Sequence, residues 1–237
     1  MNTPLPYKIY PSGDNALTIE LGNTIDLAIN QKILTLFQYL RNQDIPGIKD
    51  FIPAYNSLTV VYDVMIIREK NLLACQFIQE QMERAMLNCE KTKTIIPRRI
   101  DIPVCYDTSL GIDLEEMAKQ KKLTTKEIIR LHTQPIYHVF MIGFLPGFAY
   151  LGTVPEKIVM PRQTKPRAKI PAGSVGIAGA QTGIYSLDSP GGWNIIGQTP
   201  LQLINIEKEC PVYLQAGDEI KFIPIDLKEF KRLKNKG

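Results

Sequence analysis

The first ninety residues alternate between two hydrophobic periods. Four short runs rich in β-branched and aromatic residues predict strands: 7–10, 15–21, 48–54 and 58–62. Apolar residues three or four apart over 25–40 predict a helix capped by Thr24, and the same spacing predicts a second helix over 69–89. With an extended run over 95–104, the order β-α-β-β-α-β from residue 15 onward is typical of a ferredoxin-like α+β sandwich.

The second half opens with two short helices, each preceded by a capping-box pair. They are 114–121, behind Asp113 with Glu116, and 125–132, behind Thr124 with Glu127.

Beyond residue 136 the pattern changes to a succession of short strands. They are the start of 137–152, then 174–178, 183–187, 193–196, 201–206, 211–215 and 219–224. Many short strands in sequence argue for a β-barrel. We therefore expect an N-terminal α+β domain over residues 1–93 and an all-β barrel domain over 94–237, with the boundary at 91–94.

Composition places the chain among ordinary soluble globular proteins. It has 237 residues, of which 44% are hydrophobic and 22% charged, and a net charge of +4. Much of the basic excess lies in the tail 228–236, which we interpret as a solvated end because no basic face with interleaved aromatic residues accompanies it. Four widely spaced cysteines without a C-x-x-C pair, and no signal peptide, predict reduced thiols and a cytoplasmic protein.

The segment 161–199 carries most of the candidate chemistry. Its many Gly and Pro residues predict short strands joined by tight turns. Side chains able to bind a small polar molecule are interleaved with them: Arg162, Lys165, Arg167, Lys169, Gln181, Thr182, Tyr185, Ser189 and Trp193. Loops on a rigid scaffold often carry binding sites, although a purely structural barrel has similar glycines.

Three of these candidates, and Phe148 before the segment, have both a functional and a structural interpretation. Arg162 and Arg167 can clamp a carboxylate or phosphate through forked hydrogen bonds, or belong to a solvated basic loop. Phe148 and Trp193 can form the wall of a ligand pocket, although core packing is the usual role of such residues.

The remaining polar candidates are weaker. Gln181 and Tyr185 can orient an amide or carboxylate, or bond to turns. His132 can act as a general acid or base, but a helix-end histidine bonded to a carbonyl is the more common case. The one other histidine in the sequence is His138, so no metal site is predicted. Ser174 lies in a near-match to a nucleophile elbow, yet no helix follows it, and no P-loop is present to hold ATP.

Three stretches carry a family resemblance: His132-Thr133, the run GFLPGFAYLG over 143–152, and PRQTKPRAKIPAGSVGIAGAQTGIYSLDSPGGWNIIGQT over 161–199. Together they closely resemble the allophanate hydrolase subunit 1 family, which includes the bacterial 5-oxoprolinase B subunit and a sporulation-kinase inhibitor. Residues 13–17 and 54–58 of the N-terminal half are similar too. The resemblance covers almost the whole chain, and the long central motif is very specific.

The resemblance implies a small N-terminal α+β domain followed by a cyclophilin-like β-barrel. It also implies an ATP-dependent 5-oxoprolinase that opens 5-oxoproline to L-glutamate, in which this chain works with subunits A and C. ATP would bind on a partner subunit or at a site shared with one. The residues expected to be catalytic are His132, Arg162 and Arg167. Those expected to bind substrate are Phe148, Tyr150, Gln181, Tyr185, Ser189 and Trp193.

The alternative is a binding protein without catalysis. In that case the barrel groove, lined by Phe148, Tyr150 and Trp193, docks on a sensor histidine kinase, and prolyl isomerase activity is a third possibility. The sequence also departs from the family pattern. Ser186 stands where Pro is common, and Gln198 stands where Arg is common, which removes one fixed positive charge that could face an acidic ligand.

Overall fold

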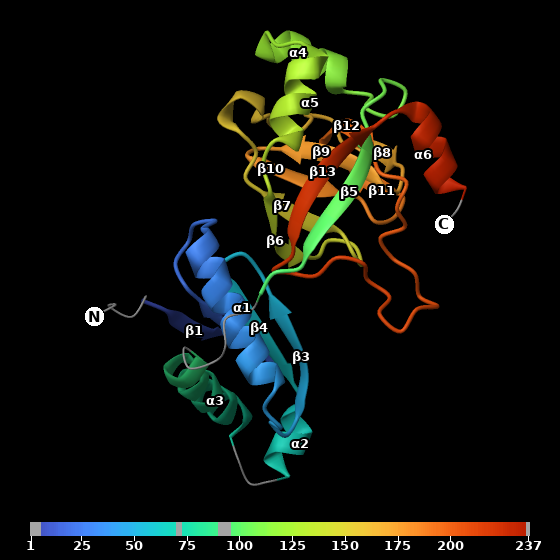
Figure 1. The fold of residues 1–237 in the computed structure, drawn as a ribbon. Coiled ribbons are helices and arrows are strands. Elements are labelled where there is room, and N and C mark those ends of the chain that lie inside the picture. The colour runs from blue at the N-terminus through green and yellow to red at the C-terminus, as the bar shows by residue number, and fades with distance from the viewer. Residues whose placement is uncertain (1–5, 70–72, 90–95, 236–237) are drawn as a thin grey trace. The chain divides into compact units, whose positions relative to one another are not determined.

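The chain divides into two compact units, residues 1–96 and 97–237, each with its own hydrophobic core. The fold comes from a computed structural model that describes residues 6–69, 73–89 and 96–235 (Figure 1). The predicted boundary at 91–94 lies outside the described residues.

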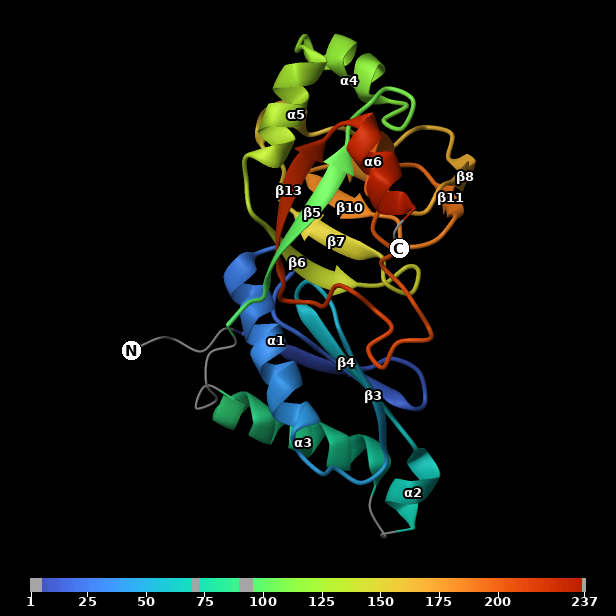
Figure 2. The same ribbon diagram turned by 45° about the vertical axis from the view of Figure 1, so that its right-hand side comes forward.

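The first unit is a four-stranded antiparallel sheet with helices on one face. Its strands, in the spatial order β1-β2-β4-β3, are β1 (Lys8–Pro11), β2 (Ala16–Glu20), β4 (Ser57–Tyr62) and β3 (Ile48–Pro53). The helices are α1 (Leu27–Arg41), α2 (Val64–Arg68) and α3 (Ala74–Asn88). Figure 2 shows α1 and α3 packed against each other. Alternate strand residues such as Leu17, Ile19 and Leu58 face these helices and are at most 1% exposed, as period-two patterning requires.

The first unit differs from the predicted strand order at one edge. The run expected to close the β-α-β-β-α-β pattern is β5 (Arg99–Cys105), and it belongs to the barrel of the second unit. β1 takes the edge position beside β2 instead. The reason is pairing: β5 lies parallel to a strand some 120 residues later in the chain, a partner that no local pattern could indicate.

Two helix starts were also misplaced. The Thr24 cap was wrong, because Asp26 occupies the N-cap and its Oδ1 accepts from the Ile29 N–H at 3.0 Å. The predicted second helix, 69–89, corresponds to α3, which begins at Ala74. The helix α2 lies before the predicted range, and the carboxylate of its N-cap residue Asp63 accepts the N–H groups of Met65 and Ile66.

The second unit contains a closed seven-stranded barrel, which confirms the predicted β-barrel. Around the barrel the order is β10-β7-β6-β13-β5-β12-β9. The remaining strands are β6 (Tyr137–Ile142), β7 (Ala149–Gly152), β9 (Ser174–Ala178), β10 (Gln181–Ile184), β12 (Asn194–Gln198) and β13 (Glu219–Ile225). β5 and β13 run side by side in both views (Figures 1 and 2). Inward residues such as Val139, Leu151 and Phe222 fill the interior and are fully buried.

Helices close off parts of this barrel. α4 (Leu114–Lys121) and α5 (Thr125–Thr133) contact each other, and the capping box of Thr124 with Glu127 is present as predicted. The basic tail was expected to be a solvated end. It forms α6 (Leu227–Lys234), which is anchored against β5 by Phe230, only 4% exposed.

The strands predicted at 201–206 and 211–215 are reduced to a single bridge between Ile204 and Val212. Pro211 has no N–H to continue the ladder, so pairing stops there. Over the described residues, no helix is both long enough and apolar enough to cross a membrane.

Candidate functional site

Four predicted site residues gather on the outer face of the barrel. Phe148 stands just before β7 and Tyr150 within it, Tyr185 follows β10, and Trp193 precedes β12. The Phe148 ring centroid lies 4.7 Å from that of Tyr150, 5.0 Å from Tyr185 and 5.5 Å from Trp193. Phe148, Tyr185 and Trp193 are at most 5% exposed, whereas Tyr150 is half-buried at the rim. We call these four residues the aromatic cluster.

Glycine makes room for these rings. A Cβ on Gly183 would lie 2.9 Å from the Trp193 ring and 3.1 Å from the Phe148 ring, and one on Gly176 would lie 3.1 Å from Trp193 Cβ. The glycines of the central segment therefore form the floor on which the aromatic cluster lies. The glycines of the predicted Gly-rich β segment thus allow the aromatic rings to pack closely against the strands.

Gln181 lies at the edge of the same face. It stands directly opposite Ala178 in the β9–β10 pair, and opposed residues of an antiparallel pair project to the same side. Ala178 packs within the aromatic cluster, so Gln181 borders it. Thr182, the next residue, points into the barrel interior.

Arg162 is the cation of this surface. Its guanidinium carbon lies 6.0 Å from the Trp193 ring centroid, a cation–π geometry. Burial raises the pKa of both Tyr150 and Tyr185, and the Arg162 charge partly offsets this shift in each. The side chain is exposed, and its guanidinium forms no hydrogen bond or ion pair with any residue that the structure describes. Its fork therefore remains available to an anion.

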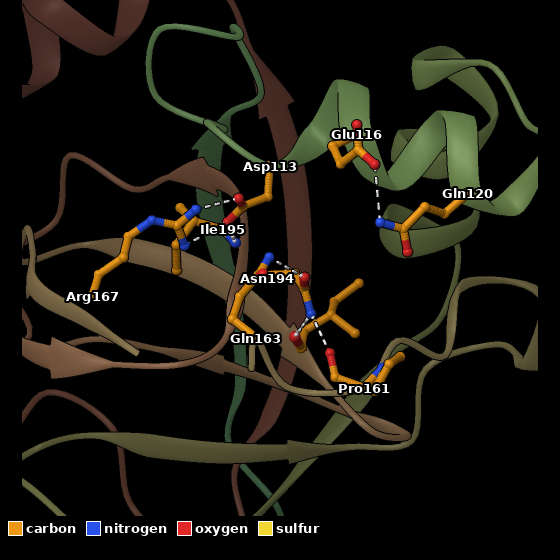
Figure 3. Close-up of polar contacts among 9 residues, drawn as sticks. Asp113, Glu116, Gln120, Pro161, Gln163, Arg167, Asn194 and Ile195 are labelled. Atoms are coloured by element: carbon orange, nitrogen blue, oxygen red, sulfur yellow. Dashed lines mark hydrogen bonds and ion pairs between the residues drawn. The ribbon is translucent and has the colours of Figure 1, made fainter. Parts of the chain in front are cut away.

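Arg167, the second predicted clamp, has a different role. It lies in β8 (Arg167–Ile170), which pairs with β11 (Ser189–Gly191), and both ends of its guanidinium bond the Asp113 carboxylate. One of these bonds, from Nη1 to Oδ2, measures 2.9 Å (Figure 3). In this structure the guanidinium of Arg167 is thus already paired with a carboxylate of the same chain, and its substrate-clamp role stays a prediction.

Asp113 is the residue whose role sequence reasoning missed. The capping-box pattern was correct for position but not for chemistry: Asp113 is the N-cap of α4, yet its side chain makes no capping bond. It is 6% exposed, and besides Arg167 it accepts the Ile195 N–H at 2.7 Å. Glu116 bonds Gln120 instead (Figure 3). The sequence alone does not show which of the distant basic residues will pair with a given carboxylate.

His132 lies in the barrel interior, fully buried, away from the aromatic cluster. Nδ1 lies 2.8 Å from the Tyr106 hydroxyl and Nε2 lies 2.9 Å from that of Thr182. The Thr182 hydroxyl donates to the Gly176 carbonyl, so we infer that it accepts from Nε2–H and that Nδ1 accepts from Tyr106.

Burial without a charged partner lowers the pKa of His132 to about 3. The ring stacks on Phe222 at 4.6 Å between centroids. A neutral, enclosed imidazole with both nitrogens engaged cannot reach a substrate in this structure. In this structure the ring is a buried polar link between α5 and the barrel, and its role in proton transfer stays a prediction.

The other polar residues have local partners. Ser189 is buried in β11, and its hydroxyl donates to the Pro190 carbonyl at 3.2 Å. Ser186 donates to the Pro146 carbonyl, and Gln198 donates to that of Ala172, each at 2.6 Å. Both departures from the family pattern thus gain a hydrogen bond inside this unit. Among the described residues, no group of three or more His, Cys, Asp or Glu side chains is placed to hold a metal ion.

An α+β unit followed by a closed barrel, with an open arginine above buried aromatic rings, is a scaffold suited to binding a small anionic ligand. The chain belongs to the family described as carboxyltransferase domain, subdomain C and D, whose model matches residues 7–214.

Two bacterial relatives match over nearly their whole length. The chain is 40% identical over 233 residues to the 5-oxoprolinase B subunit of Bacillus subtilis, covering 96% of this chain and 97% of that protein. It is 39% identical to the 5-oxoprolinase B subunit of Escherichia coli O157:H7, covering 92% and 95%. The crystal structure of TTHA0988 matches with a TM-score of 0.77 at 31% identity, over 89% of this chain. The chain spans 40% of that longer protein.

Proposed function

We propose that this chain is the B subunit of an ATP-dependent 5-oxoprolinase, which opens 5-oxoproline to L-glutamate together with subunits A and C. The observation that carries the proposal is the 40% identity to a 5-oxoprolinase B subunit over 97% of that protein's length. We assign this chain the binding of the substrate and not the whole of the chemistry.

The geometry supports a substrate role for the surface around Trp193. 5-Oxoproline is a flat five-membered lactam that carries one carboxylate. Arg162 offers a planar fork that matches a carboxylate, and the half-buried Tyr150 at the rim offers an apolar face for the ring. Gln181 at the border carries a side-chain amide, whose chemistry matches that of a lactam N–H and C=O.

The residues of this chain suit ATP less well than they suit 5-oxoproline. No P-loop is present, and the glycines of the central segment lie in barrel strands and turns instead of at a helix N-terminus. We therefore place the ATP site on a partner subunit or at a site shared with one. When bound there, ATP supplies the activation that an unstrained amide carbonyl lacks. This chain orients the lactam for that activation and for the attack of water.

The test is reconstitution. The three subunits are purified separately, and 5-oxoproline-dependent ATP hydrolysis and glutamate formation are measured with and without this chain. We expect both activities only in the complete assembly. An inactive complete assembly would refute the proposal, and inhibition of a sensor histidine kinase by the purified chain would then favour the binding-protein alternative.

We also propose the domain assignment 1–93 and 94–237, with a ferredoxin-like variant followed by a cyclophilin-like barrel. The separate cores of the two units support it. Limited proteolysis of the full chain tests the assignment: cleavage is expected first near residues 91–94. Fragments with ends deep inside either unit would contradict it.

A further inference from the structure

The position of Arg162 must be set by its neighbours. Its guanidinium donates no hydrogen bond to the residues that the structure describes, and its contact with the Trp193 ring is non-directional. A long exposed arginine without support loses much side-chain freedom when it binds an anion, and that loss weakens binding. Something must therefore limit the backbone on either side of residue 162.

Both neighbours of Arg162 are bonded to one side chain. Asn194 Nδ2 donates to the Pro161 carbonyl at 2.7 Å, and Asn194 Oδ1 accepts from Gln163 Nε2 at 2.7 Å. Figure 3 shows the Asn194 amide between Pro161 and Gln163. The Gln163 N–H adds a bond of 2.7 Å to the Gly192 carbonyl. The chain is thus held immediately before and immediately after the arginine.

Asn194 is itself rigid. It lies in β12, paired with Ile177 of β9, and its second Nδ2 proton goes to the Ile177 carbonyl at 3.0 Å. At 2% exposure, with two donors and its acceptor engaged, it has a single favourable orientation. Trp193 is the preceding residue. Trp193 therefore supplies the aromatic ring of the site, and the next residue, Asn194, holds the segment that carries the cation.

We propose that Asn194 is a positioning residue that holds Arg162 over Trp193 and so prepares the site for the carboxylate of the substrate. The inference rests on the proposed function of this surface. Asn194 does not contact the substrate and acts only through the two residues that flank Arg162. Arg167, bonded to Asp113, fixes the far end of the same segment.

The kinetic test uses the reconstituted assembly with Asn194→Ala. We expect KM for 5-oxoproline to rise about 10- to 100-fold while kcat changes by less than about twofold, because ground-state and transition-state binding are lost together. In the double variant Arg162→Ala with Asn194→Ala, the second change should add little to the first. Full multiplication of the two KM increases would overturn the proposal.

Asn30→Ala is the matched control. Asn30 is also fully buried, and its Nδ2 donates to the carbonyls of Ala54 and Tyr55, both at 3.0 Å, but it lies in the first unit. It should lower stability without raising KM. An equal KM increase in Asn30→Ala would mean that Asn194 matters only for folding.

A second measurement does not depend on activity. In the 15N-labelled full-length chain, the Nε–H resonance of Arg162 is assigned by its loss in Arg162→Ala. We expect this resonance to move in Asn194→Ala and to stay in place in Asn30→Ala. If the wild-type assembly is inactive, the proposed function fails, while this spectrum still decides whether Asn194 positions Arg162. An unmoved resonance in Asn194→Ala refutes the positioning role.

Discussion

The guanidinium carbon of Arg162 lies 6.0 Å from the centroid of the Trp193 ring. Five residues further along, Arg167 uses its whole fork on Asp113. Two arginines that look equivalent in the sequence are therefore different in kind. One is an open cation on an aromatic surface and the other is one half of a partly buried ion pair.

This difference predicts that substitution of Arg162 changes substrate binding, whereas substitution of Arg167 changes stability. Arg162→Ala should raise KM for 5-oxoproline in the reconstituted assembly by about 10-fold or more, with the free energy of unfolding unchanged within about 0.5 kcal/mol. Lys165→Ala, an exposed cation of the same loop, is the control and should change neither quantity. Urea unfolding and steady-state kinetics on the same preparations check both parts. An Arg162→Ala variant with normal KM would remove Arg162 from the site.

The Arg167–Asp113 pair should appear in stability. Arg167→Ala is expected to cost about 1–3 kcal/mol and Asp113→Ala somewhat more, because the Ile195 N–H also loses its acceptor. A double-mutant cycle in urea should give a coupling energy of about 1–3 kcal/mol. Additive effects would show that the pair contributes no net interaction.

Two adjacent glycines provide a matched pair of variants. A Cβ on Gly191 would lie 2.7 Å from Ile170 Cδ1 and in still closer contact with the Tyr185 hydroxyl, whereas one on Gly192 would meet nothing nearer than 3.5 Å. Gly191→Ala should therefore lower the free energy of unfolding by about 1–3 kcal/mol. Gly192→Ala should change it little.

The chain has one tryptophan, at position 193, so its fluorescence reports on this site directly. We expect the emission of Gly191→Ala, and not that of Gly192→Ala, to change in the folded protein. Equal behaviour of the two variants would contradict the close packing of Gly191 against Tyr185 and Ile170.

His132 predicts a pH dependence of stability. Its pKa in the folded protein, about 3, lies below the ordinary value of 6.5, so the unfolded chain takes up the proton first as pH falls. The contribution of His132 to the free energy of unfolding is fully present above pH 6.5 and is lost progressively between that value and pH 3. The slope should reach about 1.4 kcal/mol per pH unit.

The matched variant for this slope is His132→Gln, which keeps a donor and an acceptor but does not titrate. Its free energy of unfolding, followed in urea from pH 6.5 to 4, should fall less steeply than that of the wild type. Parallel slopes would show that His132 is protonated in the folded state. Loss of 5-oxoproline-dependent activity in a stable His132→Gln assembly would support the predicted catalytic role of His132.

Local sequence determined most of the secondary structure. The bounds of β9 and α4 agree with the run 174–178 and the run 114–121, because hydrophobic period and breaker residues act over a few positions. The family resemblance also depended only on the order of residues. The aromatic and polar content of the segment 161–199 was sufficient to locate Arg162 and Trp193 as candidates.

Tertiary structure decided which candidates share a surface. Whether β5 joins the sheet or the barrel depends on its pairing with β13, a contact between residues about 120 positions apart. The same holds for His132, which becomes a core residue only because Thr182 and Tyr106 are brought to its two nitrogens. Composition and spacing report what a side chain can do, whereas burial and partners, which depend on chain closure, determine what it does.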